Sequence, residues 1–138
     1  MYKNYKTLNE LGNTADKSSG ATNPPTEKET FVIYVPEITT LEDKNSLLKN
    51  NKLVVVDVYA DWCGPCKTTA PLFAELYDKY KDYCVMVKEN VDLRLSPIIQ
   101  VIPTFQIFVD GKLKSQVTGV NLGEVEQHIA SVLGIKQS

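Results

Sequence analysis

Cysteine and histidine are scarce in this sequence. Its 138 residues include three cysteines and one histidine. So few cysteines, odd in number, do not build the disulfide framework of a small secreted domain, and one histidine cannot complete an ordinary zinc site with them. Both absences favour a reducing compartment, so we expect a cytoplasmic protein with no bound metal.

Long hydrophobic runs are also missing. No window approaches the roughly eighteen consecutive apolar residues that a membrane span requires, and the N-terminus holds no apolar stretch of the about seven residues that a secretory signal needs. Acidic and basic residues nearly balance, with 17 Asp plus Glu against 15 Lys plus Arg. Without a basic field to hold a phosphate backbone, we expect neither nucleic acid nor a membrane as a partner.

The composition of the chain is sufficient for one folded domain. Hydrophobic residues make up 43% of the chain and charged residues 23%, close to the average for a globular protein that buries a core. Residues 1–30 are polar and contain an Asn-Pro-Pro run at 23–25, so we interpret them as an N-terminal extension. Residues 31–138 are the expected domain, and we expect a monomer.

Apolar runs beyond residue 30 predict the strands of this domain. The predicted strands cover residues 31–35, 53–60, 83–87, 104–109 and 113–119. Asp110-Gly111 between the last two predicts a tight hairpin. The run at 53–60 is apolar on both alternating faces except for one carboxylate, which is typical of a covered, mostly parallel sheet.

Helix signals fall between the predicted strands. Thr40 followed by Asp43 is a weak capping box that predicts a helix start. An apolar stripe at 65–81 predicts a second helix, with an expected kink at Pro71, and Gly134 is placed to cap a third. The order of strands and helices predicts an α/β sandwich around one mixed sheet.

Two cysteines stand at the start of the second predicted helix, in Trp62-Cys63-Gly64-Pro65-Cys66-Lys67. At this spacing both lie on one face, close enough to join reversibly as a disulfide. Free backbone N–H groups at a helix start favour the thiolate of Cys63, and Cys66 is held beside any mixed disulfide that Cys63 forms. The alternative is half of a zinc site, but the second pair of ligands is missing, so we favour the redox interpretation.

Asp57 is a carboxylate inside an otherwise apolar strand. Burial there is costly and raises the pKa of a carboxyl group. A buried Asp57 near Cys66 can accept the proton of that thiol when Cys66 attacks, and Lys88 on the neighbouring strand can modulate it. The alternatives are a bend or sheet edge where Asp57 reaches water, and a solvated strand-end position for Lys88.

Pro103 stands at the first position of the predicted strand at 104–109, where a proline need not donate to the sheet. A cis bond would leave the backbone of Ile102 free to pair with an extended substrate segment, although the residue pattern alone favours trans. We interpret Cys84 as a small buried hydrophobe within a strand and His128 as a solvated residue on a helix.

Together these motifs resemble the thioredoxin family. In the family's order and spacing, residues 31–138 contain VVVDVYADWCGPCK, Pro71, Lys88, Ile102-Pro103-Thr104, FVDGK at 108–112 and Gly119. The resemblance implies a thioredoxin fold, with a central mixed β-sheet flanked by helices. It also implies that Cys63 attacks the substrate, Cys66 resolves, Asp57 accepts a proton and Pro103 is cis.

The resemblance further implies a substrate-docking surface and an electron source. That surface comprises Trp62, Gly64, Pro65, Ile102, Pro103, Gly119 and Val120. Gly-Pro between the cysteines is similar to the reducing members, which favours a reductase over an isomerase or oxidant. The implied partners are protein disulfides and a thioredoxin reductase-like flavoprotein that passes on electrons from NADPH, with no cofactor bound by the chain itself.

Three features depart from the family pattern. Asp92 and Pro103 are eleven positions apart, several fewer than is typical, and Pro97 lies between them, so we expect the third helix of the family to shrink to a turn. Tyr59 stands where the family often has a larger or nonpolar aromatic residue. Residues 1–30 lie outside the family domain.

Two functions fit these observations. The first is a protein-disulfide reductase that turns over by dithiol–disulfide exchange. The second is a non-catalytic, thioredoxin-like adaptor whose groove holds a partner while the dithiol serves at most as a redox latch. The intact cysteine pair, the strand carboxylate and the Ile-Pro-Thr landmark together favour the enzyme.

Overall fold

A computed structural model describes residues 33–135 of the chain. The predicted extension 1–30 and the first two residues of the predicted strand at 31–35 lie outside the described residues. In chain order the elements are β1 (Glu37–Ile38), α2 (Leu41–Asn50), β2 (Leu53–Tyr59), α3 (Gly64–Tyr80), β3 (Val85–Asn90), the 3₁₀ turn η1 (Val91–Leu93), β4 (Thr104–Val109), β5 (Lys112–Thr118) and α4 (Leu122–Leu133).

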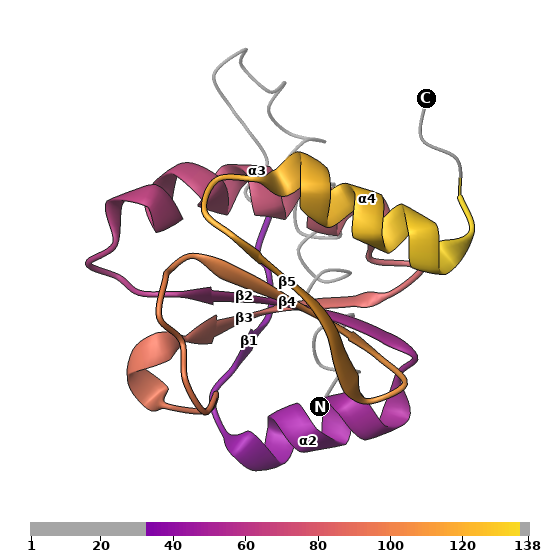
Figure 1. Cartoon of the computed structure of the whole chain (residues 1–138), viewed down its shortest axis with the longest axis horizontal. Helices are drawn as coiled ribbons and strands as arrows, with labels where there is room; N and C mark the ends of the chain where they lie inside the picture. Colours follow the sequence, from indigo (N-terminus) through magenta and orange to yellow (C-terminus); the bar gives the residue numbers. More distant parts are fainter. Residues whose placement is uncertain (1–32, 136–138) are drawn as a thin grey trace, which may run out of the picture. The chain divides into compact units, whose positions relative to one another are not determined.

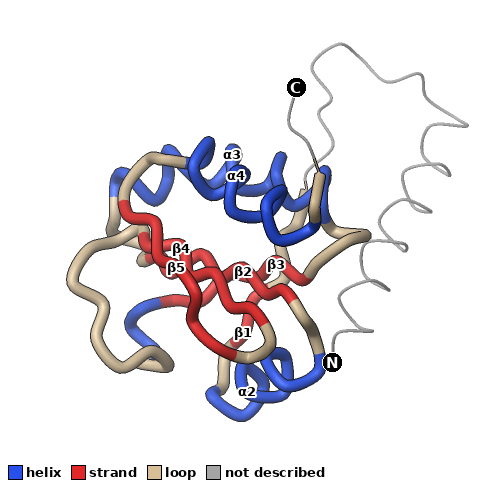
Figure 2. Tube along the Cα trace, turned by 45° about the vertical axis from the view of Figure 1, so that its right-hand side comes forward, coloured by secondary structure: helices blue, strands red, loops and turns tan. Residues whose placement is uncertain are grey.

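The described strands form one mixed sheet in the order β1-β3-β2-β4-β5. β3 is parallel to β1 and β2, whereas β4 is antiparallel to β2 and β5. Helices α3 and α4 lie together on one side of this sheet and α2 lies on the other (Figure 1), and Figure 2 shows the same three layers from a second direction. The predicted α/β sandwich around a mixed sheet is confirmed.

The local signals explain where several elements begin and end. The Thr40 hydroxyl accepts a hydrogen bond from the Asp43 N–H at 3.1 Å, which caps α2 as predicted. Asp110 and Gly111 both have positive φ, 52° and 81°, which matches a tight hairpin between β4 and β5. Gly134 ends α4 in the left-handed conformation. Pro71 lies inside α3, and the kink there stays a prediction.

The predicted strand at 31–35 is wrong in its described part. Residues 33–36 are irregular, and pairing begins only at Glu37, which lies beside Lys88. Pro36 has no N–H to give to a sheet, and its carbonyl accepts the Lys88 N–H at 2.9 Å, so the ladder starts directly after the proline.

The predicted strand at 83–87 begins too early and ends too soon. The N–H groups of Tyr83 and Cys84 both donate to the Tyr80 carbonyl, so these residues close the end of α3 and β3 starts at Val85. The strand then continues through charged positions, which an apolar pattern cannot include. Cys84 is therefore in a turn and half-buried, not a buried strand residue as predicted.

The segment between β3 and β4 is short, as the sequence predicts. Only η1 is helical there, and the chain runs irregularly from Arg94 to Pro103. In the part of the chain that the structure describes, no helix combines the length and apolarity needed to cross a bilayer. The central β2 is buried along nearly its whole length, and its C-terminal end leads directly into the cysteine motif.

Candidate active site

The two cysteines of the motif form a disulfide at the start of α3. Their Cα atoms are 5.3 Å apart. Cys63 is the N-cap of α3, and its sulfur accepts the Cys66 N–H at 3.1 Å. Pro65 occupies the first turn, where a missing N–H costs nothing. The fold therefore places the pair at a helix start, as predicted.

The start of α3 is suited to a negative charge on Cys63. An N–H aimed at its sulfur and the positive end of the helix dipole both stabilise a thiolate once the disulfide is reduced. The first turn of α3 contains no acidic residue to oppose this effect. The start of α3 therefore favours a thiolate at Cys63 once the pair is reduced.

Both cysteines are buried, and an exposed tryptophan stands beside them. Cys63 and Cys66 are each 5% exposed, whereas Trp62 is 69% exposed. The Trp62 indole N–H donates to the Asp92 carboxylate at 3.1 Å, which fixes the ring against the residues that follow β3. Trp62 is therefore an exposed aromatic ring of fixed orientation next to the buried disulfide in the sequence.

The loop before β4 closes the other side of the disulfide. The Ile102–Pro103 bond is cis, so the family resemblance is correct here and the residue pattern alone is wrong. Cys63 Sγ lies 3.8 Å from the Ile102 carbonyl oxygen. The Gly119 N–H donates to the Pro103 carbonyl at 2.9 Å, which brings the end of β5 to the same place.

The remaining predicted docking residues lie on these same elements. Gly64 and Pro65 are exposed at the start of α3, and Val120 is exposed after β5. Contacts thus link Cys63 to Ile102, and Gly119 to the adjoining Pro103. The structure records no direct contact that joins Val120 to the sulfurs.

Asp57 is buried in the middle of the sheet. It is 2% exposed, and its Oδ1 has no hydrogen-bond partner among the described residues. Burial raises the pKa of Asp57 from 3.8 to about 7; the nearby cation of Lys88 lowers it and the anion of Glu37 raises it further. The alternative of a bend or edge position for Asp57 is therefore wrong.

Lys88 is the β3 neighbour of Asp57 in the sheet register. Its side chain is half-buried, and its ammonium lies 4.4 Å from the centre of the Tyr59 ring. It therefore lies in the interior part of the strand and contacts an aromatic face, a cation–π geometry, unlike a fully solvated strand-end lysine. The predicted proximity of Lys88 to Asp57 is confirmed.

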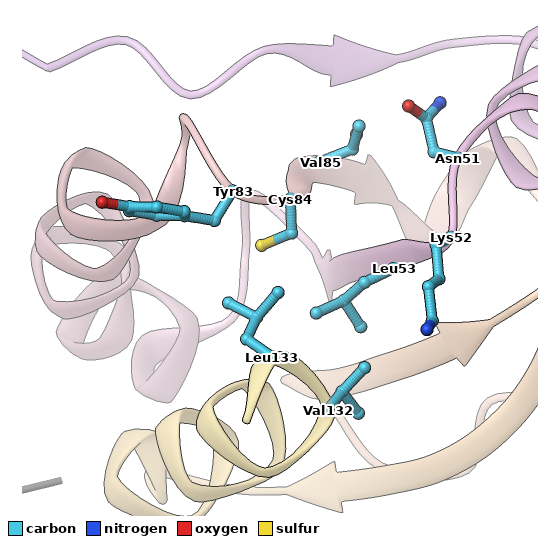
Figure 3. A pocket seen from close by; sticks show the side chains of 8 residues that line it. All are labelled: Asn51, Lys52, Leu53, Tyr83, Cys84, Val85, Val132 and Leu133. Atoms are coloured by element: carbon cyan, nitrogen blue, oxygen red, sulfur yellow. The ribbon is translucent and has the colours of Figure 1, made fainter. Parts of the chain in front are cut away.

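Cys84 lies at the other end of the sheet from this site. It lines a pocket of about 280 Å³ between the starts of β2 and β3 and the end of α4 (Figure 3). Burial raises the pKa of the Cys84 thiol to about 12, so this thiol stays protonated at neutral pH. His128 lies on α4 with Nε2 3.8 Å from a Glu124 carboxylate oxygen.

Comparison with known proteins decides the family. The family model described as Thioredoxin matches residues 34–131. Thioredoxin-1 of Saccharomyces cerevisiae is 37% identical over 100 residues, which cover 70% of this chain and 97% of the yeast protein. The chain belongs to the thioredoxin family. A solved thioredoxin from Plasmodium falciparum, 32% identical, has a TM-score of 0.65 over 70% of this chain and 98% of its own.

One relative is larger than the matched region. Thioredoxin F, chloroplastic, of Oryza sativa subsp. japonica is 42% identical over 85 residues, which are 59% of this chain and 46% of the rice protein. Thioredoxins are protein-disulfide oxidoreductases and carry no prosthetic cofactor, because the redox disulfide is part of the protein itself. The thioredoxin fold predicted from the sequence is confirmed, and the Cys63–Cys66 pair supports dithiol–disulfide exchange.

Sequence reasoning missed two residues near this site. Asp92 holds the Trp62 ring, and Glu37 acts electrostatically on Asp57. Both are ordinary charged residues at strand ends or turns, and nothing in their local pattern distinguishes them from solvated side chains. Their contacts depend on the order of strands in the sheet, which places β3 between β1 and β2.

Proposed function

We propose that this chain is a protein-disulfide reductase that works by dithiol–disulfide exchange. The observation that carries the proposal is a reversible Cys63–Cys66 pair at the start of α3, with a backbone N–H on the Cys63 sulfur and the Ile102 carbonyl beside it. Reduced Cys63 attacks one sulfur of a substrate disulfide and forms a mixed disulfide. One substrate sulfur leaves as a thiolate and takes up a proton.

Cys66 completes the exchange. It gives up its proton and attacks the Cys63 sulfur, which restores the Cys63–Cys66 disulfide and releases the second substrate thiol. Two electrons pass from the protein to the substrate. We assign the proton to Asp57, because a buried carboxyl group with a pKa of about 7 and a free oxygen can accept a proton near neutral pH.

Substrate binding follows from what surrounds the sulfurs. We assign the docking surface to Trp62, Gly64, Pro65, Ile102, Pro103, Gly119 and Val120. Exposed apolar side chains at Trp62 and Val120 support this assignment, since an extended substrate chain needs apolar contacts beside the attacking sulfur. Lys88 modulates Asp57 from the neighbouring strand.

The proposed function also requires an electron donor and a cellular compartment. Turnover requires re-reduction of the Cys63–Cys66 disulfide, and we propose a flavoprotein reductase that uses NADPH. Low cysteine content supports a reducing compartment, which we propose to be the cytoplasm, and a monomer suffices because one chain supplies both thiols.

Reduction of insulin by dithiothreitol tests the proposal. We expect rapid catalysed precipitation of insulin with the wild-type chain and a rate at the uncatalysed background with Cys63→Ser. Cys84→Ser is the matched control, because it removes a thiol that lies outside the site, and it should retain the wild-type rate. Equal rates for the wild type and Cys63→Ser would favour the adaptor.

Two further measurements define the direction and the partners. Cys66→Ser should accumulate a mixed disulfide through Cys63, which identifies substrates by mass spectrometry. The reduction potential of the Cys63–Cys66 pair should lie near the about −270 mV of a reducing thioredoxin; a value near the about −120 mV of a strong oxidant would overturn the reductase assignment.

A further inference from the structure

Three neighbouring strands place a row of charged residues across the sheet. Glu37 of β1 lies beside Lys88 of β3, and Lys88 lies beside Asp57 of β2. Register partners on adjacent strands have their side chains on the same face of a sheet. The buried carboxyl group of Asp57 therefore stands at the inner end of a row that reaches an exposed carboxylate at Glu37.

Tyr59 connects the outer members of this row. It lies two residues after Asp57 in β2, so its side chain emerges on the same face. The face of its ring lies under the Lys88 ammonium, 4.4 Å from the nitrogen, and its hydroxyl donates a hydrogen bond to the Glu37 carboxylate. One aromatic side chain thus contacts both the cation and the anion that act on Asp57.

These contacts limit where the Lys88 charge can be. A lysine on a strand has a flexible four-carbon stem, and without a partner its ammonium remains in water. Attraction to an aromatic face holds the ammonium in one position. The strength with which Lys88 stabilises the Asp57 carboxylate depends on that position, because Coulomb interactions weaken with distance and with solvation.

Lys88 and Glu37 are the charged groups that act on the carboxyl group of Asp57. Its β4 neighbour in the register is Phe105, which has no charge. In the proposed function, Cys66 of α3 supplies the proton that Asp57 accepts. Asp61 acts on Tyr59, whose own pKa is raised mainly by burial and then by its hydrogen bond to Glu37, so the Tyr59 hydroxyl stays protonated as a donor.

We propose that Tyr59 is a positioning residue, which holds the Lys88 ammonium in place beside Asp57, and that the Glu37 anion opposes this cation, so that the two residues together set the pH range in which Cys66 resolves the mixed disulfide. The inference rests on the proposed role of Asp57 as the proton acceptor. It assigns a purpose to the aromatic residue at position 59, where the chain departs from the family pattern.

The two positions give shifts of opposite sign. Tyr59→Leu removes the ring, so the Lys88 ammonium moves into water and stabilises the Asp57 carboxylate less; the midpoint of the resolving step should rise. Glu37→Gln removes an anion, so the midpoint should fall. Each shift should be about half a pH unit, the size expected for one charge several ångströms away at a partly solvated site.

The experiment uses the full-length reduced protein and 5,5′-dithiobis(2-nitrobenzoate) in stopped flow from pH 5.5 to 9. The first thionitrobenzoate released reports attack by Cys63, and the second reports attack by Cys66 on the mixed disulfide. In parallel, the ¹³C shift of the Asp57 carboxyl carbon reports its titration directly in the same variants. Tyr59→Phe keeps the ring and should lie nearer the wild type than Tyr59→Leu.

Controls separate this inference from the function on which it rests. Glu42→Gln removes an exposed carboxylate of α2 outside the row and should leave the midpoint unchanged. Glu37→Gln is isosteric and exposed, so it provides a folded variant even if Tyr59→Leu loses stability. Asp57→Asn should abolish the midpoint.

Two results would overturn the inference in different ways. Unchanged midpoints in both Tyr59→Leu and Glu37→Gln, with the midpoint lost in Asp57→Asn, would remove the positioning role and leave the proposed function standing. An unaltered pH profile in Asp57→Asn would remove Asp57 as proton acceptor, and the inference with it, while the exchange by Cys63 and Cys66 would remain.

Discussion

Asp57 holds a carboxyl group where water cannot stabilise its charge, and this has a consequence for stability as well as chemistry. The pKa of Asp57 is about 7 in the folded chain and 3.8 in a solvated reference. The folded state therefore keeps its proton across a range in which the unfolded chain has lost it. The free energy of unfolding falls as pH rises from about 4 to about 7, because ionised Asp57 favours the unfolded chain.

We predict that Asp57→Asn stabilises the protein above pH 7. A pKa difference of this size corresponds to as much as about 4 kcal/mol at high pH and to nothing below about pH 4. Urea unfolding of the oxidised protein at pH 4, 6 and 8 measures the difference between the wild type and Asp57→Asn. A gain that is the same at all three values would contradict the ionisation argument.

A second residue-scale prediction concerns Trp62. Its indole N–H donates to Asp92, which orients an otherwise exposed ring beside the disulfide. Asp92→Ala should release the ring and reduce kcat/KM for insulin several-fold, mostly through KM, while the stability changes by less than about 1 kcal/mol because the pair is exposed. Arg94→Ala changes an exposed neighbour and serves as the control. A loss confined to kcat would argue against a docking role.

At the scale of elements, α2 is fixed to the sheet by a buried ion pair. Lys44 and Glu89 are 5% and 0% exposed, and the Lys44 ammonium lies 2.6 Å from the Glu89 carboxylate. The same ammonium also donates to Ser96 and to the side-chain oxygen of Gln106, each at 3.0 Å, and the Ser96 hydroxyl donates to Glu89 at 2.6 Å. Ser96 thereby anchors the irregular segment before Pro103 onto the sheet.

We predict strong non-additivity at this ion pair. Lys44→Met leaves Glu89 buried without its cation and should cost about 3–5 kcal/mol of unfolding free energy, whereas adding Glu89→Leu should restore most of that loss. Urea unfolding of the two single variants and the double variant measures the coupling. Costs that simply add in the double variant would show that the two charges are not a pair in solution.

The sequence predicts most of the elements around this ion pair, but not the ion pair itself. Apolar periodicity placed β2 and β4 within about one residue, because their side chains follow the patterns that burial imposes, and the Thr40 capping signal placed the start of α2. The periodicity ended β3 before Lys88 and Glu89, since a buried carboxylate looks like a surface residue until its partner is known. Lys44 and Glu89 are 45 positions apart, so only the folded topology brings them together.

The functional pair was predictable for a different reason. The spacing of Cys63 and Cys66 at a helix start is a local feature, and local geometry alone brings them together. Pro103 was not predictable from its local pattern, which favours trans, and its cis form followed only from the resemblance to a family. The link from Tyr59 to Glu37 needed the strand order, because β1 and β2 pair with opposite edges of β3.

At the scale of the whole molecule, every described contact of the site lies within one compact unit that begins at Val35. We predict that a chain of residues 31–138 reduces insulin at the rate of the full-length protein and unfolds within about 1 kcal/mol of it. Matched insulin assays and urea unfolding of the two chains test the boundary. A rate reduced severalfold, with stability unchanged, would show that residues 1–30 take part in catalysis.

The two outer strands of the sheet give the molecule a further property. β1 is two residues long and follows directly after Pro36, and β5 exposes Lys112 and Lys114 at the opposite border. Short strands, prolines and lysines are the devices by which proteins keep sheet borders from recruiting foreign strands. A chain that carries a reactive disulfide thus offers little template at its sheet borders for amyloid-like growth.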